Sequence, residues 1–89
     1  MTEMATLLSS ATNYAVVRLP GRKFPGIVVQ GDSAHNLLAQ VSTIQKLAGK
    51  YADEDLDAEI ESLRDLPSEA VSHCEMVCSR QGIELPYSK

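Results

Sequence analysis

Hydrophobic and polar positions follow two different periods along the chain, and the change falls near Gly31. Tyr14–Leu19 (YAVVRL) places alternate side chains on opposite faces of an extended backbone, which predicts a strand. Ile27–Gln30 is rich in β-branched residues and predicts a second strand. The apolar run Met4–Ser9 fits either a further strand or an N-terminal turn. We therefore expect an antiparallel hairpin over residues 14–30.

The segment between the two strands contains two Pro-Gly pairs, Pro20-Gly21 and Pro25-Gly26. Proline presets φ at the first central position of a type II turn, and glycine accepts the positive φ of the second. We expect two such turns in series to form a wide hairpin. Phe24 would fold back over its apolar face, and Arg22 and Lys23 would lie at the tip.

Beyond Ser33 the apolar positions recur at i, i+3, i+4 and i+7, which is the spacing of one helix face. This pattern predicts a helix over residues 33–48. Asp32 or Ser33 would cap its N-terminus by accepting a hydrogen bond from a first-turn N–H. Gly49 would end it in the left-handed conformation, which glycine adopts without strain.

The second half of the chain combines a helical apolar stripe with a strongly acidic surface. The stripe predicts helices over about residues 54–66 and 68–81, and Pro67 between them either starts a third helix or kinks one long helix. Gly82 would end the last helix, with Ile83 packing back on its final turn.

These elements predict a single α+β domain over residues 1–89. We expect a small antiparallel sheet of two or three strands with two or three helices packed over one face. The chain has three Tyr, one Phe and no Trp, so the core would be built from Leu, Ile, Val and Ala. Such a small domain with a thin core is marginal alone, which favours a partner protein or a homodimer.

Charge and composition argue against several classes of function. The net charge of −4 and the pI near 5.0 are the opposite of the basic footprint of a nucleic-acid-binding protein. No stretch approaches the roughly 18 apolar residues of a membrane span. The N-terminal MTEMATLLSSATN has an acid at Glu3 and no basic region, unlike a secretory signal. Two cysteines are too few for a disulfide framework, which agrees with a reducing compartment. Taken together, these features lead us to expect a cytoplasmic protein without nucleic-acid or membrane partners.

No constellation in the chain matches a catalytic or metal-binding motif. Cys74 and Cys78 share a helix face, and packing as small hydrophobes explains them better than a redox role or a metal site with His73. His35 lies near Ser33, but no second orienting acid or oxyanion site accompanies them. We therefore expect no enzyme activity, no cofactor and no metal.

The acidic segment Asp53–Glu69 is the most suggestive feature of the sequence. It holds eight of the twelve acids of the chain and a single cation, Arg64. Either it is a solvated helix face, or it is complementary to a basic partner, where opposite charge speeds encounter and sets specificity. The candidate contact residues are Glu54, Asp57, Glu61 and Asp65, with Arg22, Lys23 and Phe24 at the hairpin tip as a second contact.

The block Phe24-Pro25-Gly26, followed by Gln30-Gly31-Asp32-Ser33 and an amphipathic helix, resembles the core of HicB-like antitoxins. The resemblance covers about residues 14–48 and implies a truncated ribonuclease-H-like α+β fold. The whole chain also resembles small bacterial proteins of unknown function with a similar Arg-x-Phe-Pro-Gly block. HicB-like domains usually return to a strand after this helix, whereas residues 51–82 are expected to be helical. No DNA-binding appendage follows either, so operator binding is not implied.

The resemblance and the charge pattern together predict a non-enzymatic bacterial protein-binding module of antitoxin or immunity type. It would neutralise a basic toxin by steric occlusion through the acidic helix face. Two alternatives stay open. One is a small homo-oligomeric structural module, a homodimer in which an apolar sheet face pairs with itself. The other is a small-molecule sensor or an enzyme that uses His35 or the cysteines.

Overall fold

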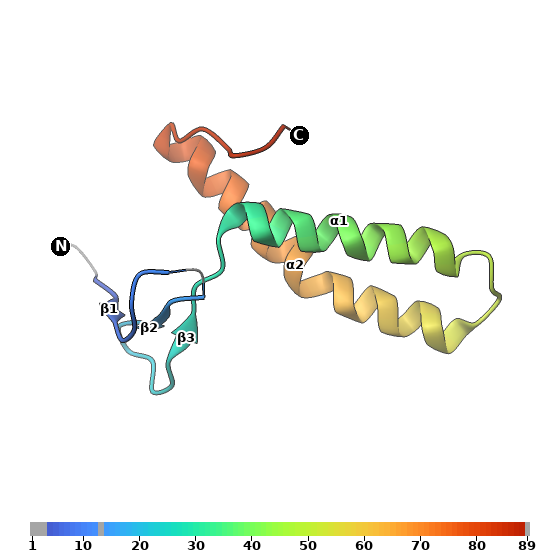
Figure 1. The fold of residues 1–89 in the computed structure, drawn as a ribbon, viewed down its shortest axis with the longest axis horizontal. Helices are drawn as coiled ribbons and strands as arrows, with labels where there is room; N and C mark the ends of the chain where they lie inside the picture. The colour runs from blue at the N-terminus through green and yellow to red at the C-terminus, as the bar shows by residue number, and fades with distance from the viewer. Residues whose placement is uncertain (1–3, 13, 89) are drawn as a thin grey trace. The chain divides into compact units, whose positions relative to one another are not determined.

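The computed structural model describes residues 4–12 and 14–88, in which three short strands are followed by two helices (Figure 1). The strands are β1 (Thr6–Leu7), β2 (Val16–Arg18) and β3 (Gly26–Ile27), and the helices are α1 (Gly31–Ala48) and α2 (Glu54–Gln81). The α+β class is therefore confirmed. The chain forms two compact units, one ending at Gln30 and one beginning at Gly31, and each is described by itself. The expected packing of helices over one face of the sheet stays a prediction.

The N-terminal unit contains an antiparallel sheet in the order β1-β2-β3. Val17 is paired on both sides, with Leu7 of β1 and Gly26 of β3. Strand β1 shows that the N-terminal apolar run forms a strand rather than a turn. The prediction that Tyr14 begins the next strand is wrong, because its φ of 64° is left-handed and β2 begins at Val16. The antiparallel hairpin itself is confirmed, with shorter strands than the sequence predicts.

The first Pro-Gly pair forms the predicted type II turn. Gly21 has a φ of 75°, and the backbone N–H of Arg22 donates to the Leu19 carbonyl at 3.1 Å, which closes the turn. The second predicted turn, at Pro25-Gly26, is wrong, because Gly26 has no positive φ and belongs to β3. One tight turn followed by an irregular segment therefore reverses the chain.

Helix α1 begins earlier than the sequence predicts. Because it starts at Gly31, Asp32 and Ser33 lie in its first turn and neither is the N-cap. The Asp32 carboxylate accepts a hydrogen bond from the Ser33 N–H at 2.9 Å, near the positive end of the helix dipole. The helix ends at Ala48, but Gly49 does not adopt the predicted left-handed conformation. A tight turn of backbone hydrogen bonds closes this end instead.

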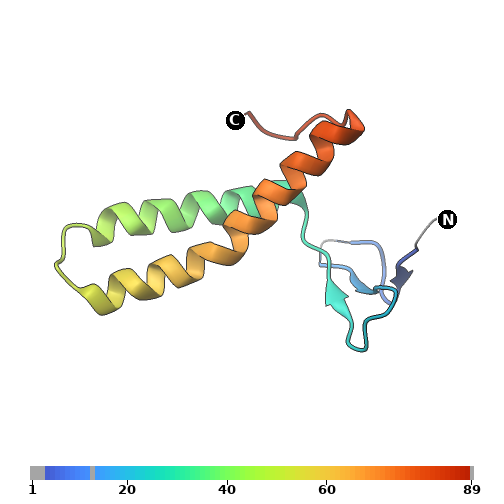
Figure 2. The ribbon, with the colours of Figure 1, turned by 180° about the vertical axis from the view of Figure 1, so that it is seen from behind.

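The two helices predicted over residues 54–66 and 68–81 are one helix, α2, with Pro67 inside it. Proline lacks the N–H that would bond to the carbonyl four residues earlier, and its ring crowds that carbonyl, which bends a helix. Figure 2 shows α2 changing direction about midway along its length. Of the two alternatives at Pro67, the kinked helix is correct and the separate third helix is wrong.

Local sequence caps both ends of α2. Asp53 is the N-cap, and its carboxylate accepts a hydrogen bond from the Leu56 N–H at 3.0 Å. Gly82 follows the helix with a φ of 69° and donates its N–H to carbonyls of the last turn, including that of Cys78. The Ile83 N–H donates to the same Cys78 carbonyl at 2.9 Å. The predicted left-handed termination is therefore confirmed, although the Ile83 side chain stays 57% exposed.

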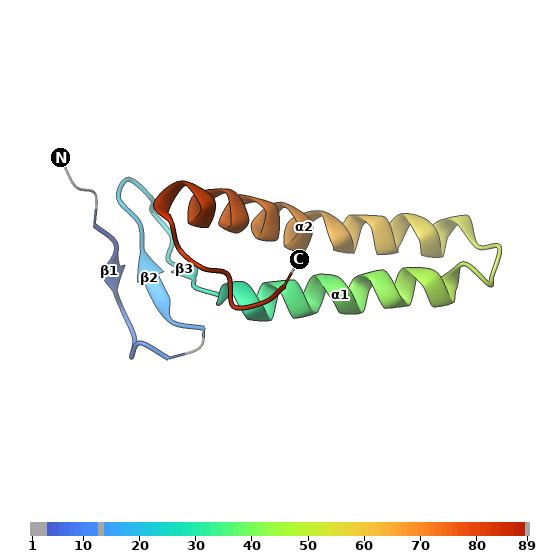
Figure 3. The same ribbon diagram turned by 90° about the horizontal axis from the view of Figure 1, so that it is seen from above.

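The core of the C-terminal unit lies between α1 and α2, which run antiparallel and side by side (Figures 1 and 3). Val41 and Ala48 of α1 and Ile60 of α2 form its buried cluster, and Val41 is only 1% exposed. Pro67 and Val71 continue the buried row along α2. The core is a single layer of a few aliphatic side chains, so it is thin. Neither α1 nor α2 is both long and apolar enough to cross a membrane.

Gly82 offers a direct test of the α2 terminus. A Cβ at this position meets no atom within 4 Å, so Gly82→Ala adds only the strain of a left-handed alanine. We expect a loss of about 1–2 kcal/mol in the free energy of unfolding, measured by urea denaturation followed by helical circular dichroism. Gly82→Asn is the matched control and should lose clearly less, because asparagine tolerates this conformation. Equal losses in both variants would contradict the explanation.

Candidate protein-binding surface

Four carboxylates form an exposed surface on the N-terminal half of α2, which we call the acidic face. It consists of Glu54, Asp57, Glu61 and Asp65, and all four side chains are exposed. They follow one another at intervals of three and four residues, which places them on one side of a helix. The structure thus brings together the four acidic residues that the sequence predicts as contacts.

No cation among the described residues neutralises the negative charge of the acidic face. No ion pair joins its carboxylates to a cation among residues 4–12 and 14–88. Arg64, the only cation of the acidic segment, instead donates from Nη1 to Oε1 of Gln45 on α1 at 2.8 Å. Gln45 also lines an open hollow of about 390 Å³, together with Asp57, Ala58 and Glu61 of α2. The carboxylates therefore remain available to a partner.

The predicted second contact belongs to the N-terminal unit. Arg22, Lys23 and Phe24 are all exposed. The prediction that Phe24 folds back over the hairpin is wrong, because 75% of its surface is exposed. Lys23 Nζ lies 5.5 Å from the Phe24 ring centroid, a cation–π contact. Arg18 donates from Nη1 to the Lys23 carbonyl at 3.0 Å and so holds the backbone of this tip.

The helix pair also carries a surface that sequence-based prediction missed, which we call the apolar face. It consists of Leu37, Ile44 and Leu47 of α1 and Leu56, Leu63 and Leu66 of α2, whose side chains are 39–74% exposed. The predicted apolar stripes do not separate the residues that a second helix buries from those that stay exposed. Both stripes are wider than the contact between two helices, and that excess width is the signal that could have revealed the apolar face.

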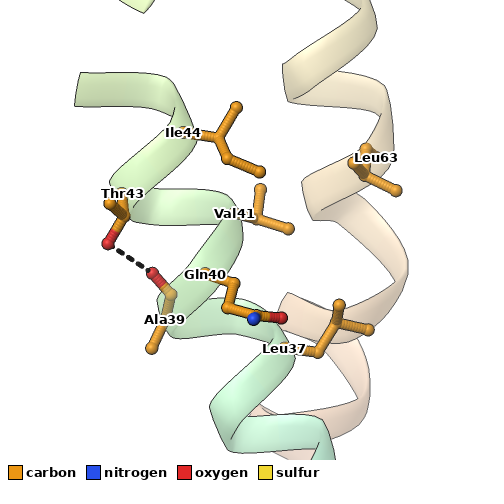
Figure 4. Close-up of a pocket in the computed structure, with 7 residues that line it drawn as sticks. All are labelled: Leu37, Ala39, Gln40, Val41, Thr43, Ile44 and Leu63. Atoms are coloured by element: carbon orange, nitrogen blue, oxygen red, sulfur yellow. Dashed lines mark hydrogen bonds between the residues drawn. The ribbon is translucent and has the colours of Figure 1, made fainter. Parts of the chain in front are cut away.

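The same spacing places the apolar face on one side of both helices. The exposed residues of α1 lie at −4, +3 and +6 from Val41, and those of α2 lie at the same offsets from Ile60. At about 100° per residue, these offsets fall to one side of each buried residue. Because the helices are antiparallel, the two sides coincide. The groove in Figure 4 accordingly combines Leu37 and Ile44 of α1 with Leu63 of α2.

The acidic face lies on the opposite side of α2. Its residues fall at −6, −3, +1 and +5 from Ile60, so they project to the other side of this buried residue.

The exposure of the apolar face has an energetic cost. Burying the exposed half of one Leu or Ile side chain gains about 1 kcal/mol. The apolar face therefore leaves several kcal/mol of hydrophobic stabilisation unrealised within the helix pair.

The C-terminal tail is attached to the helix pair by Tyr87. Its ring stacks on His35 of α1, with centroids 3.8 Å apart and an interplanar angle of 13°. Its hydroxyl donates to Oε2 of Glu75 on α2 at 3.0 Å. Figure 3 shows the tail running from the end of α2 to the first part of α1. His35 thus has a packing role that accounts for its position without catalysis.

Cys74 and Cys78 are partly buried free thiols of α2. Burial raises the pKa of the Cys74 thiol, and hydrogen bonding with Cys78 raises it further. A raised pKa keeps the thiol protonated, which is the opposite of what a nucleophilic cysteine needs. A Cβ on Gly31 would lie 3.2 Å from Cys74 Sγ, so this sulfur fills space between the helices. Among the described residues, no group of three or more His, Cys, Asp or Glu could hold a metal ion.

The pKa of Tyr87 tests the attachment of the tail. Partial burial and the hydrogen bond to Glu75 raise this pKa from 10.0 to about 12. Because the folded state favours the neutral phenol, its stabilising contribution is complete below pH 10 and is lost as the pH rises towards 12. In a Tyr14→Phe/Tyr51→Phe background, ultraviolet titration should show Tyr87 ionising near pH 12.

Removing the carboxylate partner should move this titration. Glu75→Ala is expected to lower the Tyr87 midpoint towards 10.0, because the hydrogen bond and the neighbouring charge are both lost. Glu69→Ala, which removes an exposed carboxylate elsewhere on α2, should leave the midpoint unchanged. A midpoint near 10.0 before either substitution would show that the tail is not held by Tyr87.

Comparison with known proteins places the chain in a family but assigns it no activity. No curated protein and no solved structure matches it. A model for a family of unknown function matches residues 1–87. This match bears neither on the HicB-like resemblance nor on any particular function, so both stay predictions. The chain therefore belongs to the family of unknown function DUF6959.

Proposed function

We propose that this protein is a small non-enzymatic binding module of antitoxin or immunity type. Its acidic face covers a basic surface of a partner protein, such as the substrate groove of a nucleic-acid-cleaving toxin. The observation that carries the proposal is the alignment of four exposed carboxylates on one side of α2, with no neutralising cation among the described residues. Opposite charges speed the encounter of two proteins and favour the correct partner.

The acidic face is well suited to this role because α2 holds it on a regular element. The Asp53 cap and the acids of the first turn stabilise the start of the helix. The hydrogen bond between Arg64 and Gln45 ties α2 to α1 beside Asp57 and Glu61. A surface that is already ordered loses little conformational entropy on binding, so more of the contact energy appears as affinity.

The hairpin tip supplies a second contact in this proposal. Phe24 is 75% exposed, and Lys23 lies over its ring, so the tip presents an aromatic side chain together with two cations. Aromatic and arginine side chains are enriched among the residues that dominate binding energy at protein interfaces. The free thiols Cys74 and Cys78 agree with a cytoplasmic location, where thiols stay reduced.

Charge reversal within the acidic face tests the proposal. The tagged wild-type chain is used to capture partners from its native cell lysate at low salt, with mass spectrometry of the bound proteins. We expect a stoichiometric basic partner that is released at high salt. With the purified partner, Asp57→Lys/Glu61→Lys should weaken binding at least about tenfold and flatten its salt dependence, because close charge pairs are lost.

The matched control is Asp55→Lys/Glu69→Lys. It makes the same change in net charge on exposed positions of α2, and like the test variant it alters one first-turn acid. The control should retain most of the affinity, since only long-range steering is reduced. Unchanged binding by the test variant would remove the acidic face from the mechanism. Equal losses in both variants would show that net charge, rather than this face, governs binding.

A further inference from the structure

We propose that the apolar face is a homodimer interface through which two copies of the chain form a four-helix bundle. This differs from the sheet-face dimer considered from the sequence, because the interface lies on α1 and α2. The surface consists of six exposed Leu and Ile side chains that a single helix pair leaves uncovered. Its spacing, its size and its distribution of polar residues all fit a second copy of the chain.

The spacing of the apolar face makes it self-complementary. Exposed apolar residues occur at −4, +3 and +6 from a buried residue on both helices, so α1 and α2 present equivalent ridges. Antiparallel helices with equivalent ridges are the building unit of four-helix bundles. The groove in Figure 4, of about 470 Å³, lies between Leu37, Ile44 and Leu63. Leu66 is 74% exposed on the same face. In the dimer, Leu66 of the partner subunit can insert into this groove, as in knobs-into-holes packing.

The side of the helix pair that carries the apolar face is large enough to form most of a stable interface. The 18 residues of α1 extend about 27 Å, and two helices side by side are roughly 20 Å wide. The projected area of this whole side of the helix pair is therefore on the order of 540 Å², its accessible area is larger because side chains corrugate it, and the apolar face forms its central part. Stable protein interfaces bury about 800 Å² from each partner. A second copy also supplies the second core layer that the thin cluster of Val41, Ala48 and Ile60 lacks.

The polar residues within the apolar face select one dimer arrangement. Gln40 lies at −1 from Val41, and Glu59 lies at −1 from Ile60, so the two occupy equivalent positions. If α2 packed on the partner's α2, two Glu59 carboxylates would face each other. If α1 packs on the partner's α2, the Gln40 amide can donate to Glu59 of the partner subunit. The proposed two-fold axis therefore runs parallel to the helices.

The net charge of −4 does not oppose this dimer. The acidic face projects to the opposite side of α2, so pairing of the apolar faces directs both acidic faces outward. The dimer then offers two acidic faces at once. This inference stands on the apolar face alone, and it does not require that the acidic face binds a partner.

The experiment is analytical ultracentrifugation of the full-length chain over a micromolar concentration series. We expect the wild type to sediment with twice its 9.7 kDa mass. Leu66→Glu places a carboxylate in the interface on each copy and should weaken dimerisation at least about 100-fold. Since Leu66 is 74% exposed in one copy, the variant should keep its helical circular dichroism. Met76→Glu is the control, because Met76 is an exposed apolar residue of α2 that lies at +16 from Ile60, away from the apolar face.

The outcomes separate the possible occupants of the apolar face. A wild-type monomer throughout the series overturns the proposal. If Leu66→Glu then lowers the melting temperature, another part of the same chain covers the face. A dimer that Leu66→Glu leaves intact also overturns the proposal, because the dimer must use a different surface.

Gln40→Lys tests the arrangement of the helices within the dimer. With α1 on the partner's α2, the new ammonium group faces Glu59 of the partner subunit and should tighten the dimer roughly 3- to 10-fold. With α1 on the partner's α1, two ammonium groups would face each other. A weaker dimer would therefore overturn the proposed two-fold axis.

Discussion

Close packing of α1 on α2 through a few aliphatic side chains is the interaction on which the C-terminal unit depends. Val41, Ala48 and Ile60 allow the two helices to approach, and they form one layer of core. A single layer can bury only a narrow stripe of each helix. The apolar stripes of both helices are wider than that, so the same contact that stabilises the pair also leaves six large side chains exposed.

The helix pair therefore has two sides of opposite chemistry. One side is apolar along both helices, and the other carries the acidic face of α2. Burial of apolar surface supports stable association, whereas surface charge acts on encounter rate and specificity. In the two proposals, self-association and recognition of a partner therefore use separate surfaces. The two proposals concern different surfaces, and each can stand if the other fails.

Side chains with reactive groups serve packing where the C-terminal tail contacts the helix pair. His35 stacks on Tyr87, and Tyr87 donates to Glu75, so three titratable residues hold the tail. Burial raises the pKa of Cys74, which makes its thiol less reactive at neutral pH. The residues that a sensor or enzyme would need are therefore engaged in structural contacts. These contacts account for the positions of His35 and the cysteines, and the binding role stays a proposal.

The sequence by itself determined what depends on near neighbours along the chain. The turn at Gly21, the Asp53 cap and the Gly82 terminus follow from local backbone chemistry, and the acidic face follows from helical spacing. Other features depend on contacts that local patterns do not contain. Three features depend on such contacts: the exposure of Phe24, the continuation of α2 through Pro67, and the division of each apolar stripe into buried and exposed halves. Tertiary structure decided these, because burial depends on which surface meets another, and spacing alone specifies only which residues share a face.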